Sequence, residues 1–258
     1  MLIDSHCHLE YEGLADRQDE ALQNARNAGV KGFVNISTKK SEWAQVLATA
    51  AREKDVWASV GVHPHNADDH HDLAIDDLLT AAEHPKAVAI GETGLDYHYD
   101  KSDRDVQKSL FRRHIEVARE RGLPVVIHTR DAEEDTAFIL KEELGKGAFP
   151  ALIHCFTASE HFGEEMLKLG LTISLSGIVT FKNAKNLQKF ARKIPEDRLL
   201  VETDSPFLAP VPNRGKVCEP AFVRDTAAFI ADLRGVSFEE LAETTTRNFT
   251  KLFKKAVI

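Results

Sequence analysis

The sequence predicts a (β/α)8 (TIM) barrel, and three observations lead to this prediction. Eight short apolar segments alternate with helical segments, at a spacing of roughly thirty residues per unit that suits such a barrel. The segments are apolar on both faces, as in parallel sheets covered by helices. No linker, low-complexity segment or change in composition divides residues 1–258, so we expect a single domain. An open doubly wound sheet is disfavoured, because no strand leads into a G-x-G-x-x-G turn.

The predicted strands are short and precede helical segments in strict order. They span residues 2–6, 32–36, 56–62, 87–92, 123–128, 151–155, 171–175 and 199–204. The predicted helices span residues 16–28, a segment from Ser41, an acidic stretch before Pro85, a segment ending at Arg121, and residues 132–144, 159–169, 183–193, 221–233 and 238–256. Apolar residues at helical spacing identify these segments. We expect residues 93–101 to form a loop.

The composition is that of an ordinary globular protein. Hydrophobic residues make up 43% of the chain and charged residues 29%. No apolar run is long enough to cross a bilayer, and the N-terminus lacks a signal-type segment, so we expect a cytoplasmic protein without membrane contact. The net charge of −8 disfavours a protein that coats nucleic acid. A nucleic-acid partner would therefore require a local cationic patch or a metal.

The three cysteines give no sign of a crosslinked or thiolate-based site. Their number is odd and no C-x-x-C pair occurs, which supports neither a disulfide framework nor a cysteine zinc site. By strand alternation, Cys7 and Cys155 should point toward the covering helices as small core residues.

Polar residues end the apolar strands repeatedly, starting with His6 and His8. Residues two apart in a strand share a face, so these imidazoles lie side by side. The other polar residues at strand ends are His63, Glu92, His128, His154 and Asp204. Functional groups of such barrels gather where the strands end. One histidine there is usually structural, but seven such residues predict a metal-dependent active site.

The ligand types and their number predict two divalent ions. Imidazole and carboxylate without thiolate suit Zn²⁺, Mn²⁺, Mg²⁺, Fe²⁺ or Co²⁺. The expected groups are His6, His8 and Asp204 for one ion, and His128 and His154 for the other. Glu92, on a strand between them, is the expected bridge, and a bridged pair of ions produces a hydroxide-like water. Asp204 is also a candidate to take a proton from that water.

Two further carboxylates lie deeper on the same strands. Asp4 shares a strand face with His6, and Glu202 shares one with Asp204. We expect such a carboxylate to hydrogen-bond a ligating imidazole and fix its tautomer. A buried ion pair or a solvent-facing carboxylate is the competing interpretation.

Longer motifs surround these residues. They are IDSHCHL at 3–9, GVHPH at 61–65, GETGLDY at 91–97, VIHTR at 126–130, IHCF at 153–156, ETDSP at 202–206, LAPVPNRGK at 208–216 and NFxxLF at 248–253. In this order, they make the chain resemble the TatD family of metal-dependent deoxyribonucleases, within the amidohydrolase-like metal barrels.

The resemblance implies two divalent ions, such as Mg²⁺, Mn²⁺ or Zn²⁺. The ligands that it implies are His6, His8, Glu92, His128, His154 and Asp204. It also implies that His63 and His65 lie near a substrate phosphate, and that the substrate is DNA, single-stranded and degraded from its 3′ end. Val217, Cys218 and His98 depart from the family pattern at the substrate rim, so they bear on substrate preference.

Candidate contacts to flanking phosphates come from cationic residues near the strand ends. They are Arg130, Arg214 and Lys216, together with a helical row of Lys182, Lys185, Lys189 and Arg192. A solvated helix surface is the competing interpretation of the row. Tyr97 and Phe207 are candidates for base stacking, with packing at the rim as the alternative.

Two other functions stay open at this point. A hydrolase of a small amide, a lactone or an aminoacyl-tRNA ester would suit the acidic net charge. A barrel that binds without catalysis is disfavoured, because the set of six metal ligands is intact. The residues predict a metal-dependent hydrolase, and the family resemblance implies that it cleaves the phosphodiester bonds of DNA.

Overall fold

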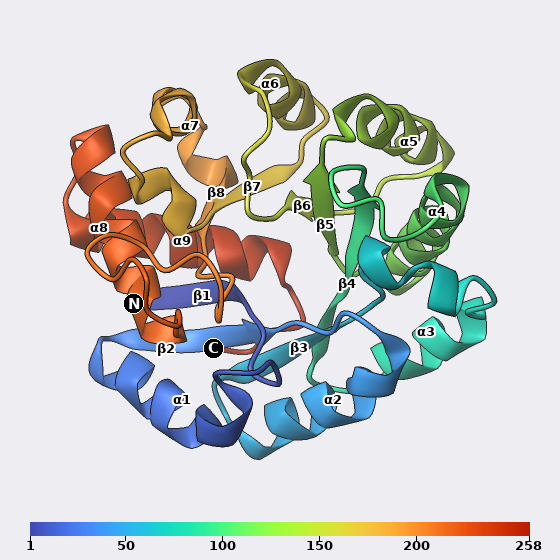
Figure 1. The fold of residues 1–258 in the computed structure, drawn as a ribbon, viewed down its shortest axis with the longest axis horizontal. Helices are drawn as coiled ribbons and strands as arrows, with labels where there is room; N and C mark the ends of the chain where they lie inside the picture. The colour runs from blue at the N-terminus through green and yellow to red at the C-terminus, as the bar shows by residue number, and fades with distance from the viewer.

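The eight strands form one parallel sheet whose spatial order is their order in the chain. The computed structural model describes residues 1–258 (Figure 1). The strands are β1 (Leu2–Cys7), β2 (Val30–Asn35), β3 (Val56–Val60), β4 (Ala87–Asp96), β5 (Val125–Arg130), β6 (Ala151–Ile153), β7 (Thr172–Leu175) and β8 (Leu199–Val201). The ring closes where β8 returns to β1, through a parallel bridge between Cys7 and Ser205. The predicted (β/α)8 barrel is confirmed.

Helices surround the barrel on its outer side, as Figure 1 shows. They are α1 (Gln18–Asn27), α2 (Trp43–Arg52), α3 (Ile75–Ala82), α4 (Arg104–Arg121), α5 (Glu133–Lys146), α6 (Glu160–Lys168), α7 (Lys185–Ala191), α8 (Val223–Arg234) and α9 (Phe238–Leu252). Ser237 caps α9 by accepting the amide N–H of Glu240. None of these helices has the combined length and hydrophobicity that a bilayer crossing demands.

The predicted loop at residues 93–101 is wrong in its first part, because β4 continues to Asp96. Residues Thr93–Asp96 pair in parallel with Ile127–Arg130 of β5. The backbones approach closely there, since a Cβ on Gly94 would lie 2.0 Å from the carbonyl oxygen of His128. Residues 93–96 were not predicted as a strand because glycine and polar residues have weak strand propensity. Pairing with β5 overrides that propensity.

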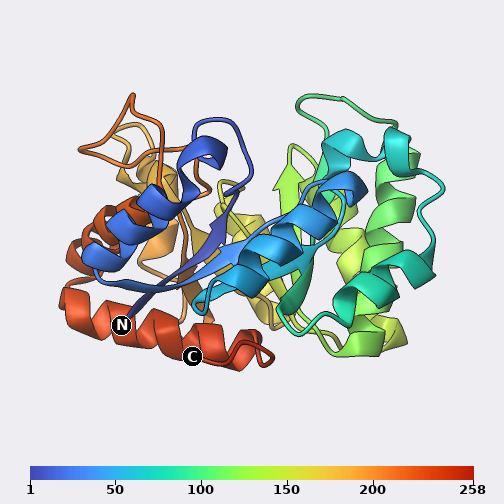
Figure 2. The ribbon, with the colours of Figure 1, turned by 90° about the horizontal axis from the view of Figure 1, so that it is seen from below.

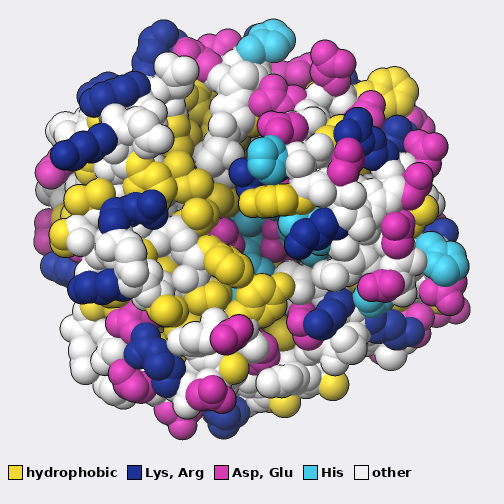
Figure 3. All heavy atoms as spheres, in the orientation of Figure 1, with side chains coloured by type: hydrophobic (Ala, Val, Ile, Leu, Met, Phe, Trp, Pro, Cys, Tyr) yellow, Lys and Arg dark blue, Asp and Glu magenta, His cyan; other side chains and the backbone are white.

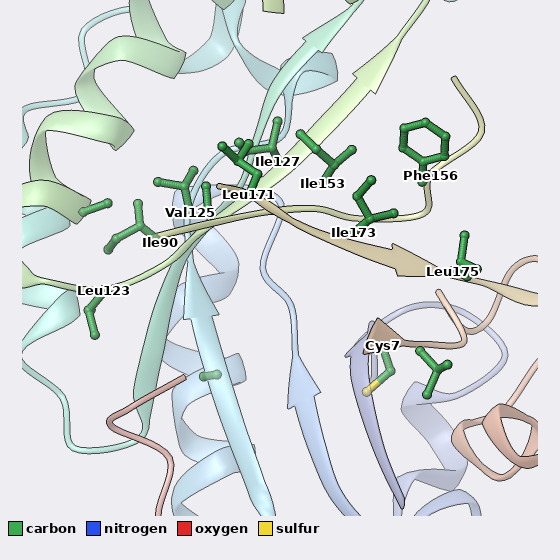
Figure 4. Packing of buried hydrophobic residues seen from close by; sticks show 14 of the residues in the cluster. Cys7, Ile90, Leu123, Val125, Ile127, Ile153, Phe156, Leu171, Ile173 and Leu175 are labelled. Atoms are coloured by element: carbon green, nitrogen blue, oxygen red, sulfur yellow. The ribbon is translucent and has the colours of Figure 1, made fainter. Parts of the chain in front are cut away.

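Two hydrophobic layers hold the barrel together. The larger has 57 buried residues, and part of it appears in Figure 4, including Ile90, Ile127 and Ile173. It lies largely between the sheet and the helices. The smaller has 13 buried residues, and it combines strand residues such as Ile3 and Leu152 with Phe249 and Phe253 near the C-terminus. Figure 2 shows α9 lying across one end of the barrel, opposite the long loops.

This arrangement leaves one end of the barrel for a site. Helix α9 covers one end with apolar side chains, whereas the loops after the strands surround the other. Because all strands are parallel, their C-terminal ends lie together at the end surrounded by these loops.

Candidate metal centre

The predicted site residues converge at the C-terminal ends of the strands. His6 is on β1, Glu92 on β4 and His128 on β5, while His154 and Asp204 directly follow β6 and β8. Their donor atoms form two groups that share Glu92. We define cluster A as His6, His8, Asp204 and Oε2 of Glu92, and cluster B as His128, His154 and Oε1 of Glu92.

Cluster A has the spacing of a metal-binding set. The Nε2 atoms of His6 and His8 are 3.1 Å apart. Each lies 3.4 Å from Oδ1 of Asp204, and they lie 3.4 and 3.7 Å from Oε2 of Glu92. A tetrahedral ion with ligands at about 2.1 Å keeps those ligands about 3.4 Å apart. The four donor atoms therefore fit a divalent ion.

Cluster B lies on the other side of the same carboxylate. Oε1 of Glu92 is 3.1 Å from Nδ1 of His128 and 2.7 Å from Nε2 of His154. These two nitrogen atoms are 3.5 Å apart. Three protein donors with a fourth position open to the pocket is the usual arrangement of a catalytic metal site. The donor set again fits a divalent ion.

Hydrogen bonds select the tautomers that such ligands need. His8 Nδ1 is 3.2 Å from the carbonyl oxygen of Ile36, so it donates there and leaves Nε2 with a lone pair toward cluster A. His154 Nδ1 is 3.3 Å from Oε1 of Glu202, which likewise leaves its Nε2 free for cluster B. His6 Nδ1 has no hydrogen-bond partner in the structure.

Asp96 fixes the tautomer of His128, although it was not among the predicted site residues. Its Oδ2 lies 2.9 Å from Nε2 of both His128 and His65. Its Oδ1 accepts the backbone N–H groups of His98 and Tyr99. His128 thus donates from Nε2 and presents Nδ1 to cluster B. Asp96 could have been predicted from the sequence, because it follows Glu92 by four residues and strand alternation places both side chains on one face.

His63 and His65 lie beside cluster B, but as donors. Nδ1 of His63 accepts the backbone N–H of His65, so neutral His63 carries its proton on Nε2. That atom lies 3.4 Å from Oε1 of Glu92. Burial lowers the pKa of His63 well below its usual range, which keeps this ring neutral. His63 therefore presents an N–H, rather than a lone pair, to the site.

The two deeper carboxylates differ from each other. Glu202 contacts an imidazole, as expected, through the bond to His154, and it also accepts the backbone N–H of Cys155. Asp4 contacts no imidazole. Its oxygens accept the backbone N–H and the hydroxyl group of Thr203, at 2.9 and 2.6 Å, and the backbone N–H of His6. Asp4 thus ties β1 to the segment that carries Asp204.

Charges within the clusters offset one another. Burial opposes ionisation of Glu92, yet the neighbouring His154 and His128 hold the pKa of its carboxyl well below the usual range. Burial also opposes protonation of His154, but Glu92 and Glu202 raise the pKa of its imidazole well above the usual range. Positive charge is therefore favoured among these carboxylates, and a divalent cation can replace the imidazolium protons.

A pocket of about 850 Å³ opens above both clusters, and its wall includes His8, His63, Glu92, His154 and Asp204. Figure 3 looks into this end of the barrel, where histidine and acidic side chains lie in a central hollow. Cys155 also lines the pocket, which corrects the prediction that it points into the helical layer. It follows the end of β6 and has a φ of 43°, so strand alternation no longer applies. Cys7 is fully buried, as predicted.

The predicted substrate contacts are divided between the pocket and the surface beyond it. Arg130 and Phe207 line the pocket. Arg214 does not, because its guanidinium lies 3.9 Å from the centre of the Phe181 ring. Tyr97 also lies outside, where its hydroxyl donates to Asp135. Tyr11, Tyr99 and Lys101 of the pocket wall were not predicted, because they lie in loops without a recognisable motif.

Comparisons with known proteins agree with this geometry. Residues 3–254 match the family model described as TatD related DNase. The chain is 46% identical over 255 residues to the metal-dependent hydrolase YcfH of Escherichia coli, covering 98% of this chain and 95% of YcfH. It is 43% identical over 256 residues to the metal-dependent hydrolase YabD of Bacillus subtilis, covering 98% and 99% of the two chains.

Solved structures show the same barrel. The TatD homologue YJJV of Escherichia coli superposes with a TM-score of 0.91 at 29% identity, over 98% of each chain. A mutant of a PTE-like lactonase of Deinococcus radiodurans, at 18% identity and a TM-score of 0.66 over 98% of this chain and 95% of its own, shares the fold alone. By sequence and by structure, this chain belongs to the TatD family of metal-dependent hydrolases.

Proposed function

We propose that this metal-dependent hydrolase is a two-metal deoxyribonuclease that removes nucleotides from an end of single-stranded DNA, in the 3′-to-5′ direction. The observation that carries the proposal is Glu92, whose two carboxylate oxygens face two separate groups of donor atoms. A carboxylate placed in this way is suited to bridging two cations. The family description names DNA cleavage and supports the choice of substrate.

The residues that would hold the ions are those of the two clusters. Cluster A would hold one ion and cluster B the other, with Glu92 between them. When bound, the pair would neutralise the charge of a phosphodiester and supply a hydroxide-like water at neutral pH. Mg²⁺, Mn²⁺ and Zn²⁺ are the ions to test, since imidazole and carboxylate donors accept each of them.

The side chains around the clusters have complementary tasks. Asp204 lines the pocket with 15% of its side chain exposed, so its carboxylate can accept a proton from a water molecule there. The Nε2–H group of His63 can donate a hydrogen bond to a phosphate oxygen. Arg130 lies at the end of β5 and has no carboxylate partner, so its guanidinium is free for an anionic substrate.

A small-molecule ester, amide or lactone is the second candidate substrate class, and one observation favours it. Arg130 and Lys101 are the only lysine or arginine residues that line the pocket, in a protein of net charge −8. A long polyanion usually meets a broader cationic surface. DNA is compatible with so few cationic residues if only its end enters the pocket, because a terminal nucleotide needs few cationic contacts.

The first experiment follows cleavage of single-stranded oligonucleotides labelled at either end. The protein is stripped with chelator and then supplied with Mg²⁺, Mn²⁺ or Zn²⁺. We expect metal to restore stepwise shortening from the 3′ end. If no metal restores cleavage in protein shown by elemental analysis to contain two ions, DNA is not the substrate, and the lactone, amide and aminoacyl-ester panel replaces it.

Asp204→Asn tests the chemistry without changing side-chain volume. It removes a ligand charge and a proton acceptor, so we expect kcat to fall by about 10²- to 10⁴-fold while the circular dichroism spectrum stays unchanged. Asp131→Asn is the matched control, because Asp131 lies outside both clusters and pairs with His98 at the rim. Near-normal turnover of the Asp204 variant with metal bound would refute the role of Asp204.

A further inference from the structure

The pocket has two chemically different walls, and each adjoins a different cluster. The first, called here the aromatic wall, is formed by Tyr11, Phe207, Leu208 and Ile178. The second, called the cationic wall, is formed by Tyr99, Lys101 and Arg130. In Figure 3, hydrophobic side chains cover much of the left margin of the central hollow, and Lys and Arg side chains lie to its right.

The aromatic wall is built onto cluster A. Tyr11 stacks on the ring of His8 with centroids 4.7 Å apart, and Phe207 meets Tyr11 edge to face at 5.9 Å. The hydroxyl of Tyr11 bonds to Thr38 at 2.6 Å, which fixes the ring. Phe207 is 49% exposed, so one side of it remains free. A fixed pair of rings with an open face is a stacking surface for a flat ligand group.

The cationic wall is built onto cluster B through Asp96. The carboxylate that orients His128 also accepts the backbone N–H of Tyr99, which places that ring beside His65. Arg130 stacks over Tyr99 at 4.8 Å, and the ammonium group of Lys101 lies 5.7 Å from the same ring centre. Neither cation pairs with a carboxylate, although Asp131 nearby pairs with His98. Two unpaired cations on one side of a pocket favour an anion there.

We infer that the pocket binds its substrate in one orientation, with a nucleobase against Tyr11 and Phe207 and a second phosphate against Arg130 and Lys101. This inference rests on the proposed function and adds the substrate class. The preferred substrate is a phosphodiester with a flat base on one side of the scissile bond and a further phosphate on the other. A pocket of about 850 Å³ is of small-ligand size, so the rest of a strand extends over the cationic wall and out of the pocket.

The test compares three thymidine dinucleotides with the metal-loaded enzyme. They are TpT, which has only the scissile phosphate, and pTpT and TpTp, which carry one more phosphate at opposite ends. We expect kcat/KM for one of the phosphorylated dinucleotides to exceed that for TpT by at least about tenfold, which corresponds to one charge-assisted contact. The other phosphorylated dinucleotide should resemble TpT, because it directs its charge toward the aromatic wall.

Two variants assign this preference to the walls. In Arg130→Ala, kcat/KM for the preferred dinucleotide should be only about one to two times kcat/KM for TpT. Phe207→Ala should lower kcat/KM for TpT and the preferred dinucleotide by a similar factor of about ten, which is the scale of one base–aromatic stack. That loss should disappear for a dinucleotide whose terminal residue is abasic.

The matched controls are exposed residues far from the pocket, Arg247→Ala on α9 and Phe138→Ala on α5, and both should behave as wild type. Cleavage of TpT, pTpT and TpTp at equal rates by the wild-type enzyme would overturn the inference while leaving the nuclease assignment intact. Equal losses on TpT and the preferred dinucleotide in Arg130→Ala would also overturn it. Failure of the metal-loaded enzyme to cleave any dinucleotide or oligonucleotide would remove the nuclease assignment and the inference together.

Discussion

A single carboxylate oxygen of Asp96 holds two imidazoles, which makes this residue the organiser of cluster B. Burial opposes its ionisation, but the bonds from His128 and His65 keep the pKa of Asp96 below its usual range. Both oxygens of Asp96 accept N–H groups, Oδ2 from the two imidazoles and Oδ1 from the backbone of His98 and Tyr99. An asparagine has one amide oxygen, and its nitrogen cannot accept either pair. His128 without this partner has no fixed tautomer, and its Nδ1 lone pair is no longer reserved for a metal.

We therefore predict that Asp96→Asn weakens metal binding in cluster B by about 10- to 100-fold and leaves cluster A nearly unaffected. Titration with Co²⁺, followed by its absorption spectrum, separates the two sites by their affinities. Asp131→Asn is again the matched control, since it also removes a histidine–carboxylate pair, His98 with Asp131, but at the rim. If the Co²⁺ affinities of both sites in Asp96→Asn equal those of the wild type, Asp96 does not orient His128.

His114 of α4 is a buried histidine outside the two metal clusters. Its Nδ1 donates to the carbonyl of Leu110, and its Nε2 accepts the backbone N–H of Val62, which precedes His63. Burial lowers the pKa of His114 from 6.5 to about 4. The unfolded chain therefore binds a proton that the folded chain does not, at any pH between these values.

The free energy of unfolding therefore decreases as the pH drops from about 6.5 to about 4. Above this range, His114 makes no pH-dependent contribution to stability. We expect this group alone to remove about 2 kcal/mol between pH 7 and pH 5. Urea unfolding of the wild type and of His114→Gln, at both pH values, measures the effect. The glutamine carbonyl can accept the N–H of Val62 but does not titrate, so the pH dependence should be weaker in the variant. Parallel pH profiles would contradict the assignment.

At the scale of elements, α9 closes the end of the barrel opposite the site. Phe249 is fully buried, with its ring 5.4 Å from Trp57 of β3 and 4.5 Å from Phe253. We predict that Phe249→Ala lowers the free energy of unfolding by about 3–5 kcal/mol, because it leaves a cavity in the smaller of the two hydrophobic layers. Phe138→Ala, on the exposed surface of α5, should change it by less than about 0.5 kcal/mol. Denaturant titration of both variants tests the contrast.

The sequence was informative about elements wherever apolar periodicity was strong. Short apolar runs located the strands, and the polar residues that ended them located the clusters. The strand prediction failed where β4 continues beyond Glu92 through Thr93 and Gly94, because only pairing with β5 makes this segment extended. Asp96 was overlooked for the same reason, because it was assigned to a loop. Tyr11 was missed because its position depends on a bond to Thr38, 27 residues along the chain. Tyr99 was missed because its position depends on Asp96, which was itself assigned to the loop.

At the scale of the whole molecule, the two clusters behave as one site because Glu92 belongs to both. Burial opposes protonation of His8 and His128, but neighbouring carboxylates raise the pKa of both imidazoles above the usual value. Protons therefore compete with metal ions for these nitrogen atoms, and the competition strengthens as pH falls. We expect metal affinity to rise with pH, and metal binding to release protons, until the imidazoles are neutral.

Metal binding is also coupled to the stability of the fold. Each bound ion should stabilise the folded chain by about 2.7 kcal/mol at a free metal concentration 100 times its Kd, so chelator should lower Tm and added metal should restore it. Glu92→Gln should weaken both sites at once, because its amide nitrogen cannot be a ligand, and the metal-dependent rise in Tm should largely vanish. Glu116→Gln, at an exposed position of α4, is the matched control and should retain two ions per chain by elemental analysis. If Glu92→Gln loses one ion and binds the other with wild-type affinity, Glu92 serves a single metal and the bridged arrangement is wrong.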